Sequence, residues 1–234
     1  MQFFLLHFAG GNCYSYDFLL KEIKAKTNID CYALELPGRG KRYSESIITS
    51  MESAIKDYVF QIQEKRNGEP YILYGHSMGA TLGFFVIQKM EKIKDPPIEF
   101  IASGNPGPGI RYKDYNNKQK KYKLSDIDFK DYLRKLGGTS EEVLMNNELF
   151  DLFSPIMRAD FQILEENNTI STKPIRTPIY AIMGKQEESA EEIHNWKKYT
   201  RAKFYAETLE GNHFFIHNHT VRLVEVVLKI NQFQ

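Results

Sequence analysis

The chain has 234 residues, of which 42% are hydrophobic and 26% are charged, and its formal net charge is +1. This length and composition fit one globular domain with a sizeable core, and the balanced charge gives no indication of a nucleic-acid or membrane partner. No apolar run approaches the ~20 residues that a membrane helix needs, and the N-terminal stretch lacks the basic leader and the small-residue cleavage site of a signal peptide.

Apolar runs of strand length alternate along the chain with segments that have helical spacing. The predicted strands are 3–8, 31–36, 71–74, 100–103, 179–183 and 203–209, and helical spacing occurs at 18–23, 55–62, 82–86 and 221–230. Most of the strand-length runs are apolar without strict alternation, as expected for strands that are covered on both faces. Strands that alternate with helices predict an α/β fold, with a mostly parallel sheet and helices on both faces.

Residues 111–173 interrupt this alternation between two of the predicted strands. The first part of this segment is basic and poor in aliphatic residues, and the second part has helical spacing. Ser125 and Asp128 match the capping-box pattern at the start of a helix, and a second helical stretch runs up to Pro155. We therefore expect a helical insertion that covers one end of the sheet, within a single domain of residues 1–234.

The sequence Gly75-His76-Ser77-Met78-Gly79 follows a predicted strand and precedes a predicted helix. In this context G-x-S-x-G is the nucleophile elbow of α/β-hydrolases, a strained turn that holds the serine hydroxyl above the sheet. We expect that Gly75 and Gly79 are required because neighbouring backbone passes too close to each of them for a Cβ. The Met78 amide is left at a helix N-terminus, where it faces a developing oxyanion. We predict that Ser77 is a nucleophile; a tight turn with an idle serine is the alternative.

A second oxyanion donor is expected from the loop after an earlier strand. The sequence Phe8-Ala9-Gly10-Gly11 ends the first predicted strand with two glycines, which permit a tight backbone whose Ala9 amide points inward. Alone, this short motif would favour a plain turn. Together with the elbow, it favours the Ala9 amide as the second donor.

The general base is expected to be a histidine after a late strand. Of the six histidines, His213 follows the predicted strand that ends at Leu209, after a turn at 211–212, and is the predicted base. A metal site at His213, His217 and His219 is the alternative. His217 and His219 would point to different helix faces, and no thiolate or carboxylate completes the set, so we expect no metal.

A carboxylate must hold the histidine in the correct tautomer and stabilise its charged form. The predicted strand that ends at Ser103 has no acid at its tip, whereas the strand that ends near Gly184 is followed by Glu187 and Glu188. Glu187 is the first choice for the acid and Glu188 the second. A solvated acidic helix start is the alternative interpretation of both.

These motifs resemble those of the stand-alone type II thioesterases of nonribosomal peptide and polyketide synthesis, almost from end to end of the chain. The matching pieces are FAGG at 8–11, LPGRG at 36–40 followed by Arg42, YGHSMGA at 74–80, SG at 103–104, KLGG at 135–138, MRADF at 157–161, Trp196 and GNHFF at 211–215. The resemblance implies an α/β-hydrolase fold with a helical lid at 111–173. It also implies hydrolysis of acyl thioesters carried on the phosphopantetheine arm of a carrier protein.

By motif match, the resemblance implies that Ser77 is the nucleophile and His213 the base, with the Ala9 and Met78 amides as the oxyanion hole. The family usually has an aspartate at the position of Glu187, so the chain departs from the pattern at the acid. Glutamate is longer than aspartate by one methylene. We therefore expect either that the backbone before Glu187 is set back or that its side chain is folded.

Two other pieces of the resemblance receive no catalytic role. LPGRG is interpreted as a strand-ending turn, and Arg158 or Asp160 of MRADF as an anchor of the lid. The basic run at 111–123 is either a solvated loop or an edge that steers acidic carrier proteins to the enzyme.

The implied chemistry needs no metal and no other cofactor, since the phosphopantetheine belongs to the partner. We expect an acyl or peptidyl carrier protein as the partner, no nucleic-acid or membrane partner, and a monomeric enzyme. Cys13 and Cys31 have no CxxC spacing, which indicates reduced thiols and a cytoplasmic location. Editing of wrongly acylated carriers is favoured over release of a finished chain. The alternatives are a carboxylesterase that acts on small oxygen esters and a binding protein without chemistry.

Overall fold

The computed structural model describes residues 1–110, 119–166 and 172–232. Its centre is a six-stranded sheet in the order β2-β1-β3-β4-β5-β6, in which neighbouring strands are parallel. The strands are β1 (Gln2–Leu6), β2 (Asp30–Leu34), β3 (Tyr71–His76), β4 (Glu99–Ser103), β5 (Ile179–Gly184) and β6 (Phe204–Leu209). Each strand ends within two residues of its predicted bounds, so the predicted α/β fold is confirmed.

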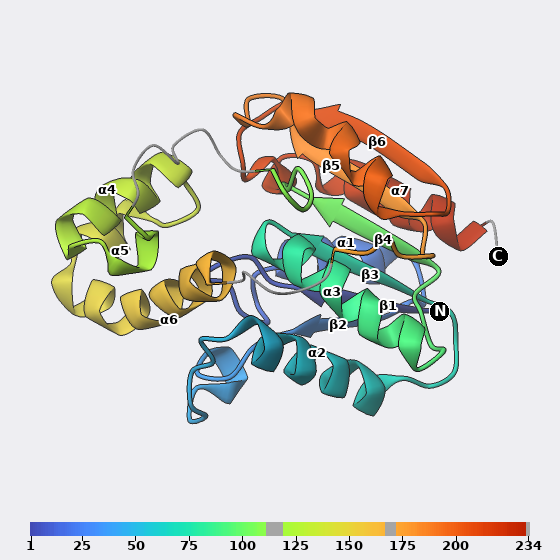
Figure 1. Cartoon of the computed structure of the whole chain (residues 1–234), viewed down its shortest axis with the longest axis horizontal. Helices are drawn as coiled ribbons and strands as arrows, with labels where there is room; N and C mark the ends of the chain where they lie inside the picture. The colour runs from blue at the N-terminus through green and yellow to red at the C-terminus, as the bar shows by residue number, and fades with distance from the viewer. Residues whose placement is uncertain (111–118, 167–171, 233–234) are drawn as a thin grey trace.

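Helices cover both faces of the sheet (Figure 1). Those that pack on it are α1 (Asp17–Lys26), α2 (Met51–Lys65), α3 (Met78–Lys92) and α7 (Thr220–Gln232). Along β1, Phe3 and Leu5 join the core shared with α1 and α7, while Phe4 and Leu6 join the core shared with α2 and α3. Because both faces of the sheet are buried, neither set of alternating side chains faces water, which explains the unbroken apolar run of this strand.

The insertion between β4 and β5 is helical and lies beside one end of the sheet (Figure 1). Its helices are η3 (Lys121–Lys123), α4 (Asp126–Leu136), α5 (Glu141–Met145) and α6 (Asn147–Glu165). They enclose a small apolar core of their own, which contains Phe129, Phe150 and Phe161. The Ser125 hydroxyl accepts a hydrogen bond from the Asp128 amide at the start of α4, which confirms the predicted cap.

The predicted end of the second insertion helix at Pro155 is wrong, because α6 continues through this residue to Glu165. A proline inside a helix removes one backbone hydrogen bond and costs ~3 kcal/mol or more. Phe150 before the proline, and Met157 and Phe161 after it, are buried in the same apolar core. Burial of such side chains stabilises by roughly 1.5–3 kcal/mol each, which together outweighs the cost of the proline.

Shorter 3-10 helices occupy connections near the carboxyl end of the sheet. They are η1 (Gly40–Arg42), η4 (Ala190–Tyr199) and η5 (Phe215–His217). In η4 the buried Trp196 donates its indole N–H to the Asn105 carbonyl at 2.7 Å, which ties this helix to the loop after β4. In the described part of the chain, no helix is both long enough and apolar enough to cross a membrane.

Candidate active site

Ser77 occupies a strained turn between β3 and α3. Its φ is 55° and its ψ is −113°, a backbone conformation that residues other than glycine rarely adopt. The Ser77 amide donates to the Ser103 carbonyl at 2.8 Å, which fixes the turn to the end of β4. A Cβ on Gly75 would lie 2.2 Å from the Gly79 carbonyl oxygen, and one on Gly79 would lie 2.2 Å from the Leu6 carbonyl oxygen. The close backbone approach predicted for both glycines is therefore confirmed.

One of the two predicted oxyanion donors begins the helix after this turn, and the other lies in the loop after β1. Met78 is the first residue of α3 and is buried. Ala9 lies in a turn in which the Gly11 amide donates to the Phe8 carbonyl at 2.9 Å, with Gly10 at φ +77°, as in a type II turn. Neither the Ala9 amide nor the Met78 amide donates a hydrogen bond in the described structure, apart from any within the regular helices and strands.

His213 lies after β6 and pairs with Glu187. The distance from His213 Nδ1 to Glu187 Oε2 is 2.6 Å, and Glu187 is 9% exposed. The other oxygen of the carboxylate, Oε1, accepts from the Gly184 amide at 2.7 Å. The glutamate side chain thus folds back onto the end of β5, which takes up its extra methylene. Glu188 is exposed, and no hydrogen bond or ion pair joins it to His213 in the described structure.

His213 also lies beside the elbow. The centroids of the His76 and His213 rings are 5.0 Å apart, and His76 immediately precedes Ser77. Burial lowers the pKa of His76 well below its usual value, with a smaller contribution from the charge of His213. In the described structure no hydrogen bond joins the Ser77 hydroxyl to His213; such bonds often form only when substrate is bound.

The histidines that follow His213 in the sequence have other contacts. His219 Nε2 donates to the Glu210 carbonyl at 2.7 Å, and the His217 ring stacks on Phe214 with a centroid distance of 6.3 Å. Among the described residues, no group of three His, Cys, Asp or Glu side chains is arranged to hold a metal ion.

Asp160 of α6 and Arg39 of the turn after β2 form a buried ion pair beside the turn at 8–11, which carries the predicted oxyanion donor Ala9 and is called the oxyanion turn below. Arg39 Nη1 and Nη2 lie 2.6 and 2.8 Å from the two carboxylate oxygens of Asp160. Asp160 Oδ2 also accepts from the Gly10 amide at 2.8 Å, and Arg39 Nη1 donates to the Gly11 carbonyl at 3.3 Å. Asp160 therefore does anchor the insertion, but the partner role of Arg39 was not predicted from LPGRG.

Arg158 is the second anchor in the same helix, and it stays within the insertion. Its Nη1 donates to the Tyr122 and Leu124 carbonyls, each at 2.9 Å, and its Nη2 lies 2.7 Å from Asp126 Oδ1. Arg158 thus fixes η3 and α4 to α6 and has no hydrogen bond to the oxyanion turn among the described residues.

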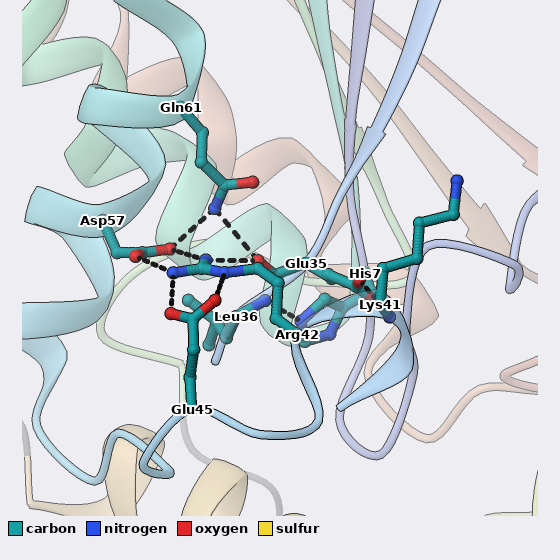
Figure 2. Close-up of polar contacts among 8 residues, drawn as sticks. All are labelled: His7, Glu35, Leu36, Lys41, Arg42, Glu45, Asp57 and Gln61. Carbon is teal, nitrogen blue, oxygen red and sulfur yellow. Dashed lines mark hydrogen bonds and ion pairs between the residues drawn. The ribbon is translucent and has the colours of Figure 1, made fainter. Parts of the chain in front are cut away.

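The turn that carries Arg39 has polar support of its own (Figure 2). Glu35 accepts from the Lys41 amide at 2.7 Å and from the Cys13 amide at 3.0 Å. Arg42 bridges the Glu35 carbonyl at 2.9 Å and the Asp57 carboxylate of α2 at 2.7 Å. These bonds fix the turn to α2 and to the loop after β1.

The basic run at 111–123 lies partly outside the described residues, because 111–118 are not among them. Lys120 forms an ion pair with Glu166 at 3.1 Å, and Lys121 Nζ lies 5.0 Å from the centroid of the Tyr132 ring. Both lysines therefore already have partners inside the insertion, which favours a structural role for them.

The sequence of the chain matches a known family along nearly its whole length. A sequence model of the thioesterase domain family matches residues 1–231. The chain is 29% identical over 232 residues to the linear gramicidin dehydrogenase LgrE of Brevibacillus parabrevis, which covers 96% of this chain and 85% of that protein. It is 28% identical to the gramicidin S biosynthesis protein GrsT of Aneurinibacillus migulanus, over 98% of this chain and 88% of that protein.

Solved structures agree with this assignment. The type II thioesterase BorB from the borrelidin biosynthetic cluster superposes with a TM-score of 0.85 at 26% identity, and the match covers 98% of this chain and 91% of that chain. The chain therefore belongs to the thioesterase family, has the α/β-hydrolase fold, and is a hydrolase related to the type II thioesterases of nonribosomal peptide and polyketide synthesis.

Proposed function

We propose that the protein hydrolyses acyl thioesters held on the phosphopantetheine arm of a carrier protein, through an acyl-enzyme formed on Ser77. The observation that supports this proposal is that the His213–Glu187 pair lies beside the elbow, with the His213 ring 5.0 Å from the ring of His76, the residue before Ser77. The similarity to GrsT and BorB supports carrier-bound substrates, because their names assign them to gramicidin S and borrelidin biosynthesis.

In this mechanism the Ser77 hydroxyl attacks the thioester carbonyl carbon while His213 Nε2 accepts its proton. Glu187 holds the Nδ1–H of the imidazole and stabilises the imidazolium that forms. The oxyanion of the tetrahedral intermediate accepts hydrogen bonds from the Ala9 and Met78 amides. The imidazolium gives its proton to the departing pantetheine thiolate, and a water activated by His213 then hydrolyses the acyl-serine.

The proposed biological role is editing, in which the enzyme frees carrier proteins that bear a wrong acyl group. Release of a finished product is the narrower alternative. We further propose that the enzyme acts in the cytoplasm as a monomer; both of its cysteines are free thiols in the structure. Size-exclusion chromatography in the presence and absence of a carrier protein tests the oligomeric state.

Two other activities are weighed against this proposal. The name of LgrE includes a dehydrogenase activity, but this chain contains no G-x-G-x-x-G sequence and follows β1 with Ala9-Gly10-Gly11. A carboxylesterase would use the same nucleophile on oxygen esters. The near end-to-end match to the thioesterase family favours thioesters over both.

The test compares specificity constants on three substrates: an acetylated carrier protein, acetyl-pantetheine, and p-nitrophenyl acetate. We expect the highest kcat/KM on the carrier protein and no turnover by the Ser77→Ala variant. A preference for p-nitrophenyl acetate would instead identify a carboxylesterase. Absence of turnover on all three substrates would identify a binding protein. A panel of acyl carriers of increasing chain length then defines the acyl group that is removed.

A further inference from the structure

The Arg39–Asp160 pair is more deeply buried than an anchor for a surface insertion requires. The side chains are 2% and 0% exposed. Burial alone would lower the pKa of the Arg39 guanidinium, but the Asp160 carboxylate raises it above its usual value, so the guanidinium stays charged. A buried pair of this kind contributes little net stability compared with apolar residues of the same size. Its position therefore needs another explanation.

The pair forms hydrogen bonds with the backbone of the oxyanion turn at two adjacent residues. Asp160 Oδ2 accepts from the Gly10 amide at 2.8 Å, and Arg39 Nη1 donates to the Gly11 carbonyl at 3.3 Å. These groups follow the Ala9 amide within one four-residue turn that is closed by the hydrogen bond from Gly11 to Phe8. The Ala9 N–H shares a peptide plane with the Phe8 carbonyl, which accepts from the Gly11 amide at 2.9 Å. The bonds to the Gly10 N–H and the Gly11 carbonyl hold the residues on either side of that donor, and so they restrict rotation of the plane that carries the Ala9 N–H.

The helix that supplies Asp160 also touches the turn directly. A Cβ on Gly10 would lie 3.0 Å from Met157 Cγ, so the backbone of the turn packs against α6. Asp160 lies on the same buried side of α6 as Met157 and Phe161. Any displacement of α6 would therefore move the acceptor of the Gly10 amide together with the surface that covers it.

We propose that Asp160 and Arg39 are positioning residues for the Ala9 oxyanion donor, and that through them the seating of α6 determines whether the oxyanion hole is formed. The inference rests on the proposed function of Ala9. An oxyanion donor acts only when it is held in place, and a misplacement of ~1 Å in an active site can lower the rate about 10²-fold. The insertion thus takes part in the reaction without touching the acyl group.

The test uses Asp160→Asn, Arg39→Lys and a matched control, Arg158→Gln. Asparagine can still accept from the Gly10 amide, but it has no charge, and its NH2 group replaces the second oxygen that accepts from the guanidinium. Lysine cannot form the two-pronged pair. The control loosens the same helix without reaching the turn. Each variant is assayed for kcat and KM on acetyl-pantetheine and on p-nitrophenyl acetate. The Ki of an alkyl trifluoromethyl ketone, which forms an oxyanion-bearing adduct with a nucleophilic serine, is measured in parallel.

We expect kcat to fall by roughly 10- to 100-fold in Asp160→Asn and by about 3- to 10-fold in Arg39→Lys, with KM nearly unchanged. The Ki of the ketone should rise by the same factors, and the control should stay within about 2-fold of wild type. Equal effects in the variants and the control, or a change in KM alone, would overturn the inference. If Asp160→Asn does not fold, Arg39→Lys decides.

The second substrate separates the inference from the proposed function. Hydrolysis of p-nitrophenyl acetate develops the same oxyanion as thioester hydrolysis. A wild-type enzyme that cleaves the ester but not the thioester would contradict the proposed function, while the ratio of kcat values on the ester would still confirm or overturn the positioning role.

Discussion

Glu187 and Asp160 are both buried near the carboxyl end of the sheet, and their partners differ. Glu187 pairs with His213, whereas Asp160 pairs with Arg39. An imidazole exchanges its proton near neutral pH, while a guanidinium keeps its charge throughout the range in which proteins are folded. The first pair suits a step in which a proton moves, and the second suits a fixed scaffold. The function of a buried carboxylate thus follows from what its partner can do with a proton.

Removal of the imidazole is the most complete way to break the first pair. We expect His213→Ala to fold normally and to lose about 10⁶-fold in kcat, because the members of a catalytic triad act as a unit. Release of free thiol from an acyl-pantetheine measures the loss. His219→Ala is the control, since the His219 ring hydrogen-bonds the Glu210 carbonyl and not Glu187, and it should keep most of its activity. A similar loss in both variants would contradict the assignment.

Replacement of the carboxylate by an amide leaves the shape of the pair and removes its charge. We expect Glu187→Gln to lose on the order of 10⁴-fold in kcat, because the histidine is then held in the wrong tautomer. Glu187→Asp should be partly active, because the shorter side chain reaches the imidazole less well. Glu188→Gln should keep nearly full activity, because the Glu188 side chain is exposed. If Glu188→Gln lost activity instead, the acid would be Glu188. Full activity of both amide variants would reduce the triad to a dyad.

The second pair should respond mainly in stability when one partner is removed. We expect Arg39→Ala to lower the free energy of unfolding by about 3–5 kcal/mol, because it leaves the Asp160 charge buried and alone. Replacing both partners, as in Arg39→Met with Asp160→Leu, should restore most of the stability without restoring kcat. Urea unfolding and steady-state kinetics measure the two quantities. Wild-type stability of Arg39→Ala would show that water reaches the pair.

His7 sharpens the comparison as a buried histidine that has no hydrogen bond to a carboxylate among the described residues. Burial, and then the charge of Arg39, lowers its pKa from 6.5 to about 4. Between these values the unfolded chain binds the proton and the folded chain does not, so the stability from His7 is present above pH 6.5 and is lost as pH falls towards 4. A shift of this size corresponds to about 3 kcal/mol.

The measurement is urea unfolding at several pH values between 7 and ~4, for wild type and for His7→Asn. The asparagine amide can still donate to the Phe8 carbonyl, as His7 Nδ1 does at 2.8 Å. We expect a flatter dependence on pH in the variant. Equal slopes would mean that another group, such as the buried His76, dominates acid unfolding.

Local patterns in the sequence predicted the strands and the elbow because their causes are local. The apolar runs give the strands, and the spacing of Gly75, Ser77 and Gly79 follows from the crowded backbone of one turn. Glu187 and His213 were also predicted together, since each follows the end of a late parallel strand, and such ends meet at one edge of the sheet.

The Arg39–Asp160 pair could not be predicted in this way. Its partners are 121 residues apart, and neither belongs to a short motif with a known geometry. The available signal was a charge on the apolar side of α6, close to Met157 and Phe161, because a buried charge requires a partner. The continuation of α6 through Pro155 was missed for a similar reason: tertiary packing outweighed a local rule.

The hydrogen bonds from α6 to the first loop also bear on how the chain folds during synthesis. β4 ends at Ser103 and β5 begins at Ile179, so the edge of β4 stays open while the ribosome makes the insertion. Open strand edges invite pairing with other chains, and long-range parallel pairing is slow. Asp160 can dock on the N-terminal half before β5 exists, which would carry the growing chain back towards that edge. We expect variants of this anchor to aggregate during expression more than their equilibrium stability alone would explain.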